Sequence, residues 1–273
     1  MNHSLKYYFT LARSKESHYQ NILRDLKYFL RSHGISDATL ALEDEHDLSA
    51  EEALKLETFF SSYLSGIPLD YILNESEFMG YKFYVDPRVL IPRPETELIV
   101  EWVLDLSFKK NSTILEVGTG SGCIAISICL KNENLKILAT DISDKALEVA
   151  ILNREKHDAN NVTLVQSNWM SCVAKNSLDV IISNPPYLKS NDAHLANLKH
   201  EPLIALTSDK GSQSFYEIAS QGIYSLKPGG KIIFEHGYSQ AEEVSNILID
   251  FGYKNIISKQ DLQGLDRYIY ANK

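Results

Sequence analysis

The spacing of hydrophobic and polar residues predicts helices over roughly the first seventy residues. Between residues 22 and 30, apolar side chains recur at the interval of a helix with one buried face. Another helix is expected after Ser49, because Ser49 and Glu52 form a capping box ahead of a second apolar stripe. Residues 37–47 lie between these helices, are acidic and follow no clear period. We therefore expect a small helical domain over residues 1–75.

A different pattern begins near residue 76. Aromatic residues on either side of Gly80 predict a short β-hairpin, and residues 76–92 are expected to link two domains. Downstream, short apolar strands alternate with helical segments. Alternation of this kind predicts an α/β domain over residues 93–273, in which helices cover both faces of a mostly parallel sheet. The expected strands lie near residues 113–117, 136–140, 162–166, 178–183, 230–235, 254–258 and 266–271.

Composition narrows the classes of function that the chain can have. Of its 273 residues, 44% are hydrophobic and 23% are charged, as in ordinary globular proteins. The net charge of −9 argues against a broad attraction to nucleic-acid phosphates, and no apolar run reaches membrane-spanning length. Cys123, Cys129 and Cys172 form no CxxC pair and fall in core-like segments, so we expect buried thiols in a reducing compartment. These observations predict a cytoplasmic protein that binds neither nucleic acid nor membrane directly.

A glycine-rich turn follows the first strand of the α/β domain. The strand Ile114–Val117 leads into Gly118-Thr119-Gly120-Ser121-Gly122, and a helix follows. Glycines at such a turn let a ligand approach the backbone, and the amino end of the helix attracts electronegative groups. Asp141 ends the next strand, where an acid can bind ribose hydroxyls. The turn therefore predicts a nucleotide-like cofactor, although a tight strand–helix connection alone would account for the same glycines.

Two cofactors compete for this turn. A nicotinamide dinucleotide fingerprint requires G-x-G-x-x-G, but Cys123 stands where the last glycine would fall. The pattern Glu116-x-Gly118-x-Gly120-x-Gly122 suits S-adenosylmethionine better, because that ligand has no pyrophosphate to lay against the helix. Asn168 and Trp169 follow the third strand and are candidates to contact the amino edge and the ring of adenine. For Trp169, ordinary core packing is an equally good explanation.

The most informative tetrapeptide is Asn184-Pro185-Pro186-Tyr187, which closes the apolar strand 178–183. Each proline lacks a donor and biases the preceding residue toward extended geometry, so the strand cannot continue its ladder. The side-chain oxygen of Asn184 and the carbonyl of Pro185 are then two acceptors in a rigid frame, beside the ring of Tyr187. Such a pair suits a planar amino group with two N–H bonds to donate. For Pro-Pro alone, a turn after a core strand is the plainer interpretation.

Together these residues suggest methyl transfer from a sulfonium to nitrogen. An in-line displacement requires mainly alignment, but an amide or aromatic amine nitrogen is a poor nucleophile because its lone pair is delocalised. Acceptors on both N–H bonds would draw the nitrogen out of conjugation, which is preorganised electrostatic stabilisation. Asn184, Pro185 and Tyr187 are therefore the expected catalytic residues. The eight histidines are scattered without ligand spacing, so no metal is expected.

At this point the chain resembles a known family. The glycine turn and the Asn184–Tyr187 tetrapeptide are similar to those of class I S-adenosylmethionine-dependent N-methyltransferases. The segment from Leu90 to Glu97, LIPRPETE, is similar to the hallmark of the HemK/PrmC family, the release factor glutamine methyltransferases. Further segments that fit this family follow in order, namely Gly66-Ile67-Pro68, Glu201-Pro202, Glu235-x-Gly237-x-x-Gln240 and Asp261 with Gly264 and Arg267.

The resemblance implies a Rossmann-like methyltransferase that methylates N5 of the glutamine in the Gly-Gly-Gln motif of class 1 peptide chain release factors. It also implies that the amino-terminal helices dock the release factor and that S-adenosylhomocysteine is the second product. Carried over by position, the implied cofactor contacts are Glu116, Gly118, Thr119, Gly120, Ser121, Gly122, Asp141, Trp169 and Asn184. The implied substrate contacts are Arg93, Asn184, Pro185, Pro186 and Tyr187.

Several alternatives stay open. Arg93 between two prolines is equally well explained by an ion pair with Glu95 or Glu97 that braces the hinge. Glu201 and Pro202 are also consistent with the end of a helix. Gln240 is also consistent with a solvated position on a helix. At the level of function, the alternatives are an adenine or guanine amine methyltransferase acting on nucleic acid, and a non-catalytic scaffold that binds the cofactor.

Overall fold

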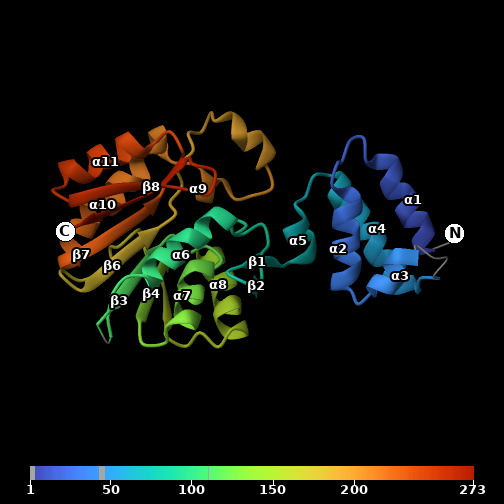
Figure 1. The fold of residues 1–273 in the computed structure, drawn as a ribbon, viewed down its shortest axis with the longest axis horizontal. Coiled ribbons are helices and arrows are strands. Elements are labelled where there is room, and N and C mark those ends of the chain that lie inside the picture. Colours follow the sequence, from blue (N-terminus) through green and yellow to red (C-terminus); the bar gives the residue numbers. More distant parts are fainter. Residues whose placement is uncertain (1–3, 43–46, 110) are drawn as a thin grey trace. The chain divides into compact units, whose positions relative to one another are not determined.

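The computed structural model describes residues 4–42, 47–109 and 111–273. The chain divides between Asn74 and Glu75 into two compact units, whose helices and strands are labelled in Figure 1. Part of the acidic stretch 37–47 forms a short helix, α3 (Asp37–Leu42), whereas residues 43–46 lie outside the described residues. None of the helices in the described ranges is long and apolar enough to cross a membrane.

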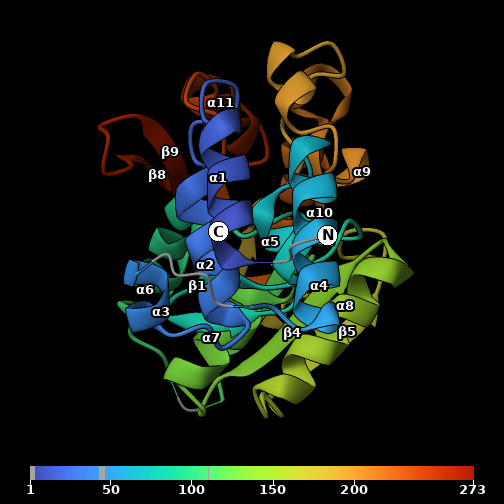
Figure 2. The same ribbon diagram turned by 90° about the vertical axis from the view of Figure 1, so that its right-hand side faces the viewer.

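The first unit consists of helices. Helices α1, α2 and α4 lie side by side (Figures 1 and 2) and share an apolar core that includes Phe9, Leu26 and Phe59. Both predicted helices are present, and Ser49 and Glu52 form the expected capping box at the start of α4. Besides α3, the helices are α1 (Leu5–Lys15), α2 (Ile22–Ser32), α4 (Ala50–Leu64) and α5 (Leu69–Leu73).

The second unit contains a seven-stranded sheet with the order β5-β4-β3-β6-β7-β9-β8. The strands from β5 to β7 run parallel, and β9 pairs antiparallel with both β7 and β8. This confirms the predicted mostly parallel sheet. The strands are β3 (Thr113–Val117), β4 (Lys136–Asp141), β5 (Val162–Gln166), β6 (Leu178–Ser183), β7 (Leu226–Glu235), β8 (Lys254–Gln260) and β9 (Asp266–Asn272).

The largest difference from the predicted strand boundaries is at the start of β7. The strand β7 begins at Leu226 and not near residue 230, because Leu226 already pairs with Leu178 of β6. A register shift follows before Val180 pairs with Lys231. The polar, glycine-containing stretch 227–230 therefore lies within the irregular part of the strand, although its composition resembles a turn.

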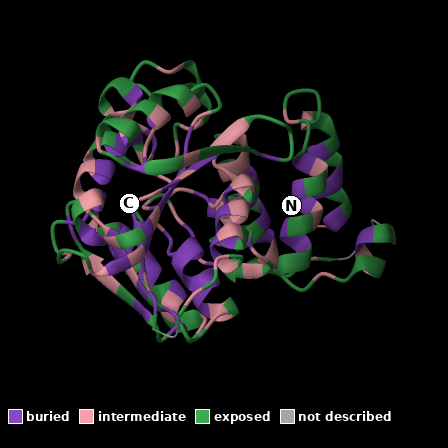
Figure 3. Ribbon diagram, turned by 60° about the vertical axis from the view of Figure 1, so that its left-hand side comes forward, coloured by how far each residue is buried: buried purple, intermediate pink, exposed green. Residues whose placement is uncertain are grey.

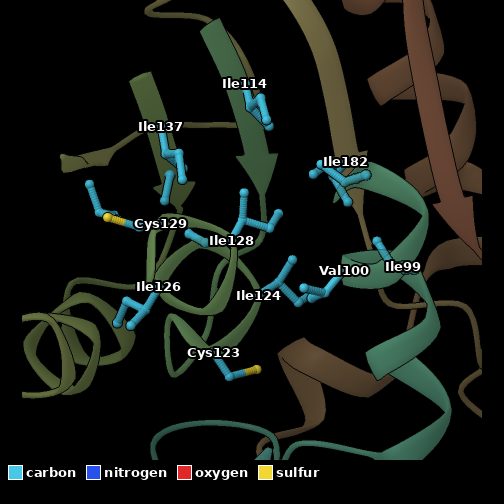
Figure 4. Packing of buried hydrophobic residues seen from close by; sticks show 14 of the residues in the cluster. Ile99, Val100, Ile114, Cys123, Ile124, Ile126, Ile128, Cys129, Ile137 and Ile182 are labelled. Atoms are coloured by element: carbon cyan, nitrogen blue, oxygen red, sulfur yellow. The ribbon is translucent and has the colours of Figure 1, made fainter. Parts of the chain in front are cut away.

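Alternating side chains of the sheet build two cores, one on each face, as a period of two requires. On one face Ile114, Ile137 and Ile182 pack against α6 (Glu97–Leu104) and α7 (Cys123–Lys131), as Figure 4 shows. On the other face strand residues pack against α10 (Gln213–Ser225) and α11 (Ala241–Asp250). Figure 3 shows buried residues concentrated along the strands and on parts of the helices.

Shorter elements connect these layers. The expected hairpin is formed by β1 (Ser76–Phe78) and β2 (Tyr81–Phe83). Pro94 stands at the start of a 3-10 turn, η1 (Pro94–Thr96), that leads into α6. The remaining elements are α8 (Asp144–Lys156), η2 (Ala193–Asn197), α9 (Leu203–Leu206) and η3 (Asp209–Gly211).

The cysteines do not all behave as predicted. Cys123 and Cys129 are buried on α7, but Cys172 is exposed. The prediction that Cys172 is a buried thiol is wrong, because the residue lies in the turn between β5 and β6 and not in a core strand or helix.

Candidate active site

The predicted site residues gather at the carboxyl edge of the sheet. The glycine turn follows β3, Asp141 ends β4, Asn184 follows β6 and Glu235 ends β7. Because these strands are parallel, their carboxyl ends meet along one edge, which is where open α/β sheets bind ligands. Two cavities open there, and Asn184 lines both.

The first cavity has a volume of about 490 Å³. The glycine turn contributes Gly118 and Gly120 to its wall, both with positive φ, at +75° and +54°. A Cβ added to either glycine would meet no heavy atom within 4 Å, so the backbone here faces open space. Other lining residues predicted from sequence are Asp141, Asn168, Trp169, Asn184 and Pro186.

Asp141 is held in place by the backbone around it. Its Oδ2 accepts a hydrogen bond from the Gly120 amide and its Oδ1 from the Ser143 amide, each at 2.9 Å. Burial raises the pKa of Asp141, and these backbone hydrogen bonds oppose the rise. The carboxylate therefore braces the glycine turn and also forms part of the cavity wall.

Four residues expected to contact the cofactor do not line this cavity: Glu116, Thr119, Ser121 and Gly122. Glu116 is buried beneath the turn, where its Oε2 accepts from the Thr119 hydroxyl at 2.6 Å and from the Ala125 amide at 3.0 Å. Burial raises the pKa of Glu116 to about 8. These residues support the turn from behind.

Gly122 has a packing role of its own. It adopts a φ of +82°, and a Cβ there would come within 2.9 Å of the Ile126 Cδ1 and 3.4 Å of the Ala150 Cβ. The clash would therefore be with Ile126 in the first turns of α7, whereas Ala150 of α8 would be at about ordinary contact distance. Glycine is therefore required at this position for steric reasons, and the requirement comes from packing at the start of α7 and not from the first cavity.

The position of Trp169 confirms core packing and also places the residue at the wall of the first cavity. The residue lines the first cavity and also packs against the core beside α10 and α11. Its backbone has a φ of +51°, which is uncommon for a bulky side chain. The side chain is therefore positioned by core packing and at the same time forms part of the cavity wall.

The second cavity has a volume of about 550 Å³ and lies beside the acceptor tetrapeptide. Of this tetrapeptide, Asn184, Pro185 and Tyr187 line the second cavity, whereas Pro186 lines the first. Burial raises the pKa of the Tyr187 phenol to about 12, so the side chain is neutral at physiological pH. Further lining residues that carry charge are Arg93, Lys189, Asp192, Glu235, Glu243 and Arg267.

The Asn184 carboxamide has a defined partner. Its Nδ2 donates to the Thr96 hydroxyl oxygen at 3.2 Å, and the Thr96 hydroxyl donates to Glu235 Oε2 at 2.7 Å. Thr96 and Glu235 are 4% and 2% exposed, so the hydrogen bond between them is shielded from water, whereas Asn184 is partly exposed. Sequence reasoning missed Thr96 and treated Glu235 only as part of a family segment. The available signal for Glu235 was its place at the end of a parallel strand.

Arg93 does not pair with Glu95 or Glu97, so that alternative is wrong. Its guanidinium contacts Glu201 Oε1 at 2.5 Å, and Glu201 Oε2 accepts from the Ile91 amide at 3.1 Å. Glu97 instead accepts from the Met79 amide at 2.6 Å. Glu201 thus ties the segment 91–93 to the start of α9, and Arg93 still lines the second cavity.

Gln240 is not a solvated helix residue. It caps α11, and its Oε1 accepts from the Gly237 amide at 2.9 Å. Its Nε2 donates to the carbonyls of Gly211 at 2.9 Å and Tyr187 at 3.3 Å. One side chain therefore joins the acceptor tetrapeptide to η3 and α11.

Comparisons with known proteins place relatives of this chain among methyltransferases. The model of the family described as Methyltransferase small domain matches residues 95–205. A release factor glutamine methyltransferase from Shewanella oneidensis is 35% identical over 95% of this chain and 91% of that protein. Another from Coxiella burnetii is 36% identical over 87% of each. In fold, a methyltransferase structure from Pyrococcus furiosus matches with a TM-score of 0.56 at 20% identity, covering 80% of this chain and 98% of that chain.

Proposed function

Because this chain belongs to the family of release factor glutamine methyltransferases, we propose that it methylates the side-chain amide nitrogen, N5, of a release factor glutamine. The substrate would be the glutamine of the Gly-Gly-Gln motif in class 1 peptide chain release factors, and S-adenosylmethionine would be the methyl donor. The observation that carries the proposal is the position of Asn184 between the two cavities. A donor in one cavity and an amide in the other would meet at that residue.

The first cavity fits S-adenosylmethionine. Gly118 and Gly120 leave room at the turn that a Cβ would fill, Asp141 offers carboxylate oxygens to ribose hydroxyls, and Trp169 offers an aromatic wall. When bound, this cofactor supplies an electrophilic methyl group on a sulfonium. Glu116, Thr119, Ser121 and Gly122 would contribute indirectly, since they hold the turn and its helix in position.

The second cavity fits a primary amide. The Asn184 Oδ1 and the Pro185 carbonyl would accept the two N–H bonds of the glutamine amide, and Tyr187 would pack against its plane. These acceptors would favour the geometry in which the nitrogen lone pair is no longer delocalised into the carbonyl. Pro185 and Pro186 fix the backbone in advance, so little reorganisation is required when the substrate binds. Pro186 and Arg93 would complete the wall around the reacting group.

The two units would divide the work between them. Both cavities are lined only by residues of the second unit, among the described residues, so the chemistry would belong to that unit. Most of the lining comes from residues 93–273, and Arg88, Val89 and Leu90 of the segment 76–92 contribute as well. The helical residues 1–75 would dock the release factor, and the segment 76–92 would link the two parts. A substrate that serves translation agrees with action in the cytoplasm, without direct binding to nucleic acid or membrane.

Mass spectrometry tests the proposal. Purified protein, S-adenosylmethionine and an unmodified class 1 release factor should yield a Gly-Gly-Gln peptide heavier by one methyl group, with fragmentation assigning the group to the glutamine. Asn184→Ala should lower kcat by roughly 100-fold or more, by analogy with loss of one preorganised hydrogen-bonding group. The cofactor Kd should change little, since Asp141 and the glycine turn are intact.

The controls separate the alternatives. Methyl incorporation into DNA or RNA in place of the peptide would favour a nucleic-acid amine methyltransferase. Cofactor binding without transfer to any substrate, together with full biological activity of Asn184→Ala, would favour a scaffold. Either outcome would contradict the proposed function.

A further inference from the structure

A chain of two hydrogen bonds, one buried and one partly buried, reaches the acceptor tetrapeptide from two other elements. Asn184 Nδ2 donates to Thr96 Oγ1, and Thr96 Oγ1 donates to Glu235 Oε2. Thr96 comes from the turn η1, and Glu235 ends strand β7, so the contacts join residues 88 and 139 positions apart in the sequence. The sequence-based assignment of the site gave neither residue a role.

The direction of these two hydrogen bonds determines which end of the Asn184 carboxamide faces the substrate. A threonine hydroxyl has a single hydrogen, and here it is given to Glu235. The Thr96 oxygen can then only accept, so the amino group of Asn184 must turn toward it. The carboxamide oxygen is left as the end that accepts from a substrate N–H.

The opposite orientation would defeat the proposed reaction. A carboxamide has an acceptor at one end and two donors at the other, and the two ends have nearly the same shape. If Asn184 rotated by half a turn, its amino group would meet the amino group of the substrate amide. Two donors would then face each other, and the substrate nitrogen would lose one of its acceptors.

We propose that Thr96 and Glu235 are positioning residues for Asn184, and that the carboxylate form of Glu235 fixes its orientation through Thr96. This inference rests on the proposed function for its consequence in catalysis. A protonated Glu235 can donate to Thr96. The Thr96 hydroxyl is then free to donate to Asn184, which reverses the chain and presents the amino end of Asn184 to the substrate.

The groups around Glu235 come from several elements. The hydrogen bond from Thr96 and the charge of Arg267 of β9 favour the carboxylate, and the nearby Asn184 carboxamide favours it to a smaller extent. Glu95 opposes it, Tyr187 and Tyr268 face it as neutral phenols, and His236 follows it in sequence with a pKa lowered by burial. Burial outweighs the favourable contacts and raises the pKa of Glu235 to about 7.

The sign of the pH effect follows from this balance. Above about pH 7, Glu235 is ionised, accepts from Thr96 and fixes the productive orientation. As the pH falls through that value, the Glu235 carboxylate gains a proton, and the direction of the two hydrogen bonds can reverse. We therefore expect the methylation rate to fall on the acidic side with a midpoint near the pKa of Glu235.

Three substitutions in the full-length protein test the inference with an unmodified release factor as substrate. Thr96→Val removes the hydroxyl at similar volume and should lower kcat by about 10- to 100-fold, with a much smaller change in KM. Thr96→Ser should rescue most of the loss because the hydroxyl is restored. Glu235→Gln cannot ionise, so its rate should lose the acidic limb of the pH profile.

A matched control guards against a general effect on folding. Ser127→Ala removes another buried hydroxyl, one that has no hydrogen-bond partner within the described ranges and lines neither cavity. It should leave kcat and the pH profile at wild-type values. The cofactor Kd and the unfolding temperature of each variant then report whether the fold is intact.

A second measurement does not depend on the substrate. In 15N-labelled protein, the side-chain amide signal of Asn184 can be identified by its disappearance in Asn184→Asp. In the wild type and Thr96→Ser it should shift with a midpoint near the pKa of Glu235. In Glu235→Gln the shift should be absent, and in Thr96→Val it should be at least halved.

The two measurements separate the possible failures. If the wild type methylates glutamine but Thr96→Val and Glu235→Gln keep its kcat and acidic limb, the positioning role is wrong while the proposed function stands. If the wild type leaves glutamine unmodified, the proposed function fails, and the amide signal decides the inference by itself. An Asn184 signal that titrates equally in Glu235→Gln overturns it.

Discussion

Ionisation of Glu235 serves the proposed chemistry but lowers the stability of the folded protein. The side chain is 2% exposed, and burial raises its pKa to about 7 from an ordinary value of 4.5. A carboxylate this deeply buried is costly unless its partners compensate fully, and here Thr96 and Arg267 compensate only in part. The folded protein therefore keeps an acid whose ionisation lowers its own stability.

This opposition predicts a pH-dependent gain in stability for Glu235→Gln. Since the folded-state pKa lies above the unfolded value, the contribution of Glu235 to stability is present at low pH and is lost as the pH rises through about 7. The variant removes that loss. It should be more stable than the wild type at about pH 8, by at most about 3 kcal/mol, and similar to it near pH 5.

Denaturant unfolding at the two pH values provides the measurement, with Glu242→Gln as the control. Glu242 is exposed on α11, so Glu242→Gln reports the effect of removing an acidic side chain from the surface. A Glu235→Gln variant that is less stable than the wild type at high pH would show that the carboxylate is net stabilising, contrary to our expectation.

At the residue scale, the sequence predicted local chemistry better than long-range partners. Asp141 and the glycines could be predicted because strand, turn and acid follow one another in the chain. The partner of Arg93 could not, since Glu201 lies 108 positions away and nearer acids, Glu95 and Glu97, compete for the same prediction. For the same reason Thr96 escaped notice, because its role depends on two elements that only the fold brings together.

At the scale of elements, Gly122 at the start of α7 combines a positive φ with a close approach to the Ile126 side chain. Gly122→Ala should destabilise the protein in two ways. An alanine at a φ of +82° costs about 1–2 kcal/mol in backbone strain. The contact with the Ile126 Cδ1 at 2.9 Å should add roughly 1–3 kcal/mol of overpacking.

Gly229→Ala separates the two contributions. Gly229 has a φ of +76°, but a Cβ there meets no heavy atom within 4 Å. This variant should therefore show the backbone cost alone. Chemical unfolding of both variants measures the difference, and equal losses of stability would mean that the Ile126 side chain moves aside without measurable cost.

The order of helices and strands followed from sequence because each element carries its own period. Alternation along the strands was clear where both faces of the sheet are covered, as at Ile114 and Leu115, which point into different cores. The start of β7 was missed because residues 227–230 are polar and rich in glycine. Strand pairing with β6 overrides that local composition.

At the scale of the whole molecule, each unit has a core of its own. The first unit packs around Phe9, Leu26 and Phe59, and the second has a core on each face of its sheet. A unit with its own core is expected to fold alone. We therefore predict that residues 75–273, expressed alone, unfold cooperatively and bind S-adenosylmethionine with a Kd within about threefold of the full chain.

The same fragment tests the division of work between the units. On a short Gly-Gly-Gln peptide its kcat should match that of the full chain, whereas on an intact release factor its KM should be much higher. Peptide and intact substrate are compared under the same conditions. Equal KM values for the full chain and the fragment on the intact release factor would argue against docking by the helical unit.

The place of β9 in the sheet has a consequence for the order of folding. This strand follows β8 in the chain but lies between β7 and β8, so β8 has no neighbour until β9 is in position. The same strand brings Arg267 beside Glu235 and Tyr268 against the backbone of Glu95. Pairing of β9 with β7 and β8 and completion of the site around Glu235 should thus occur in the same folding step. A folding intermediate that lacks β9 would hold the glycine turn and Asp141 but not Arg267, which lines the second cavity.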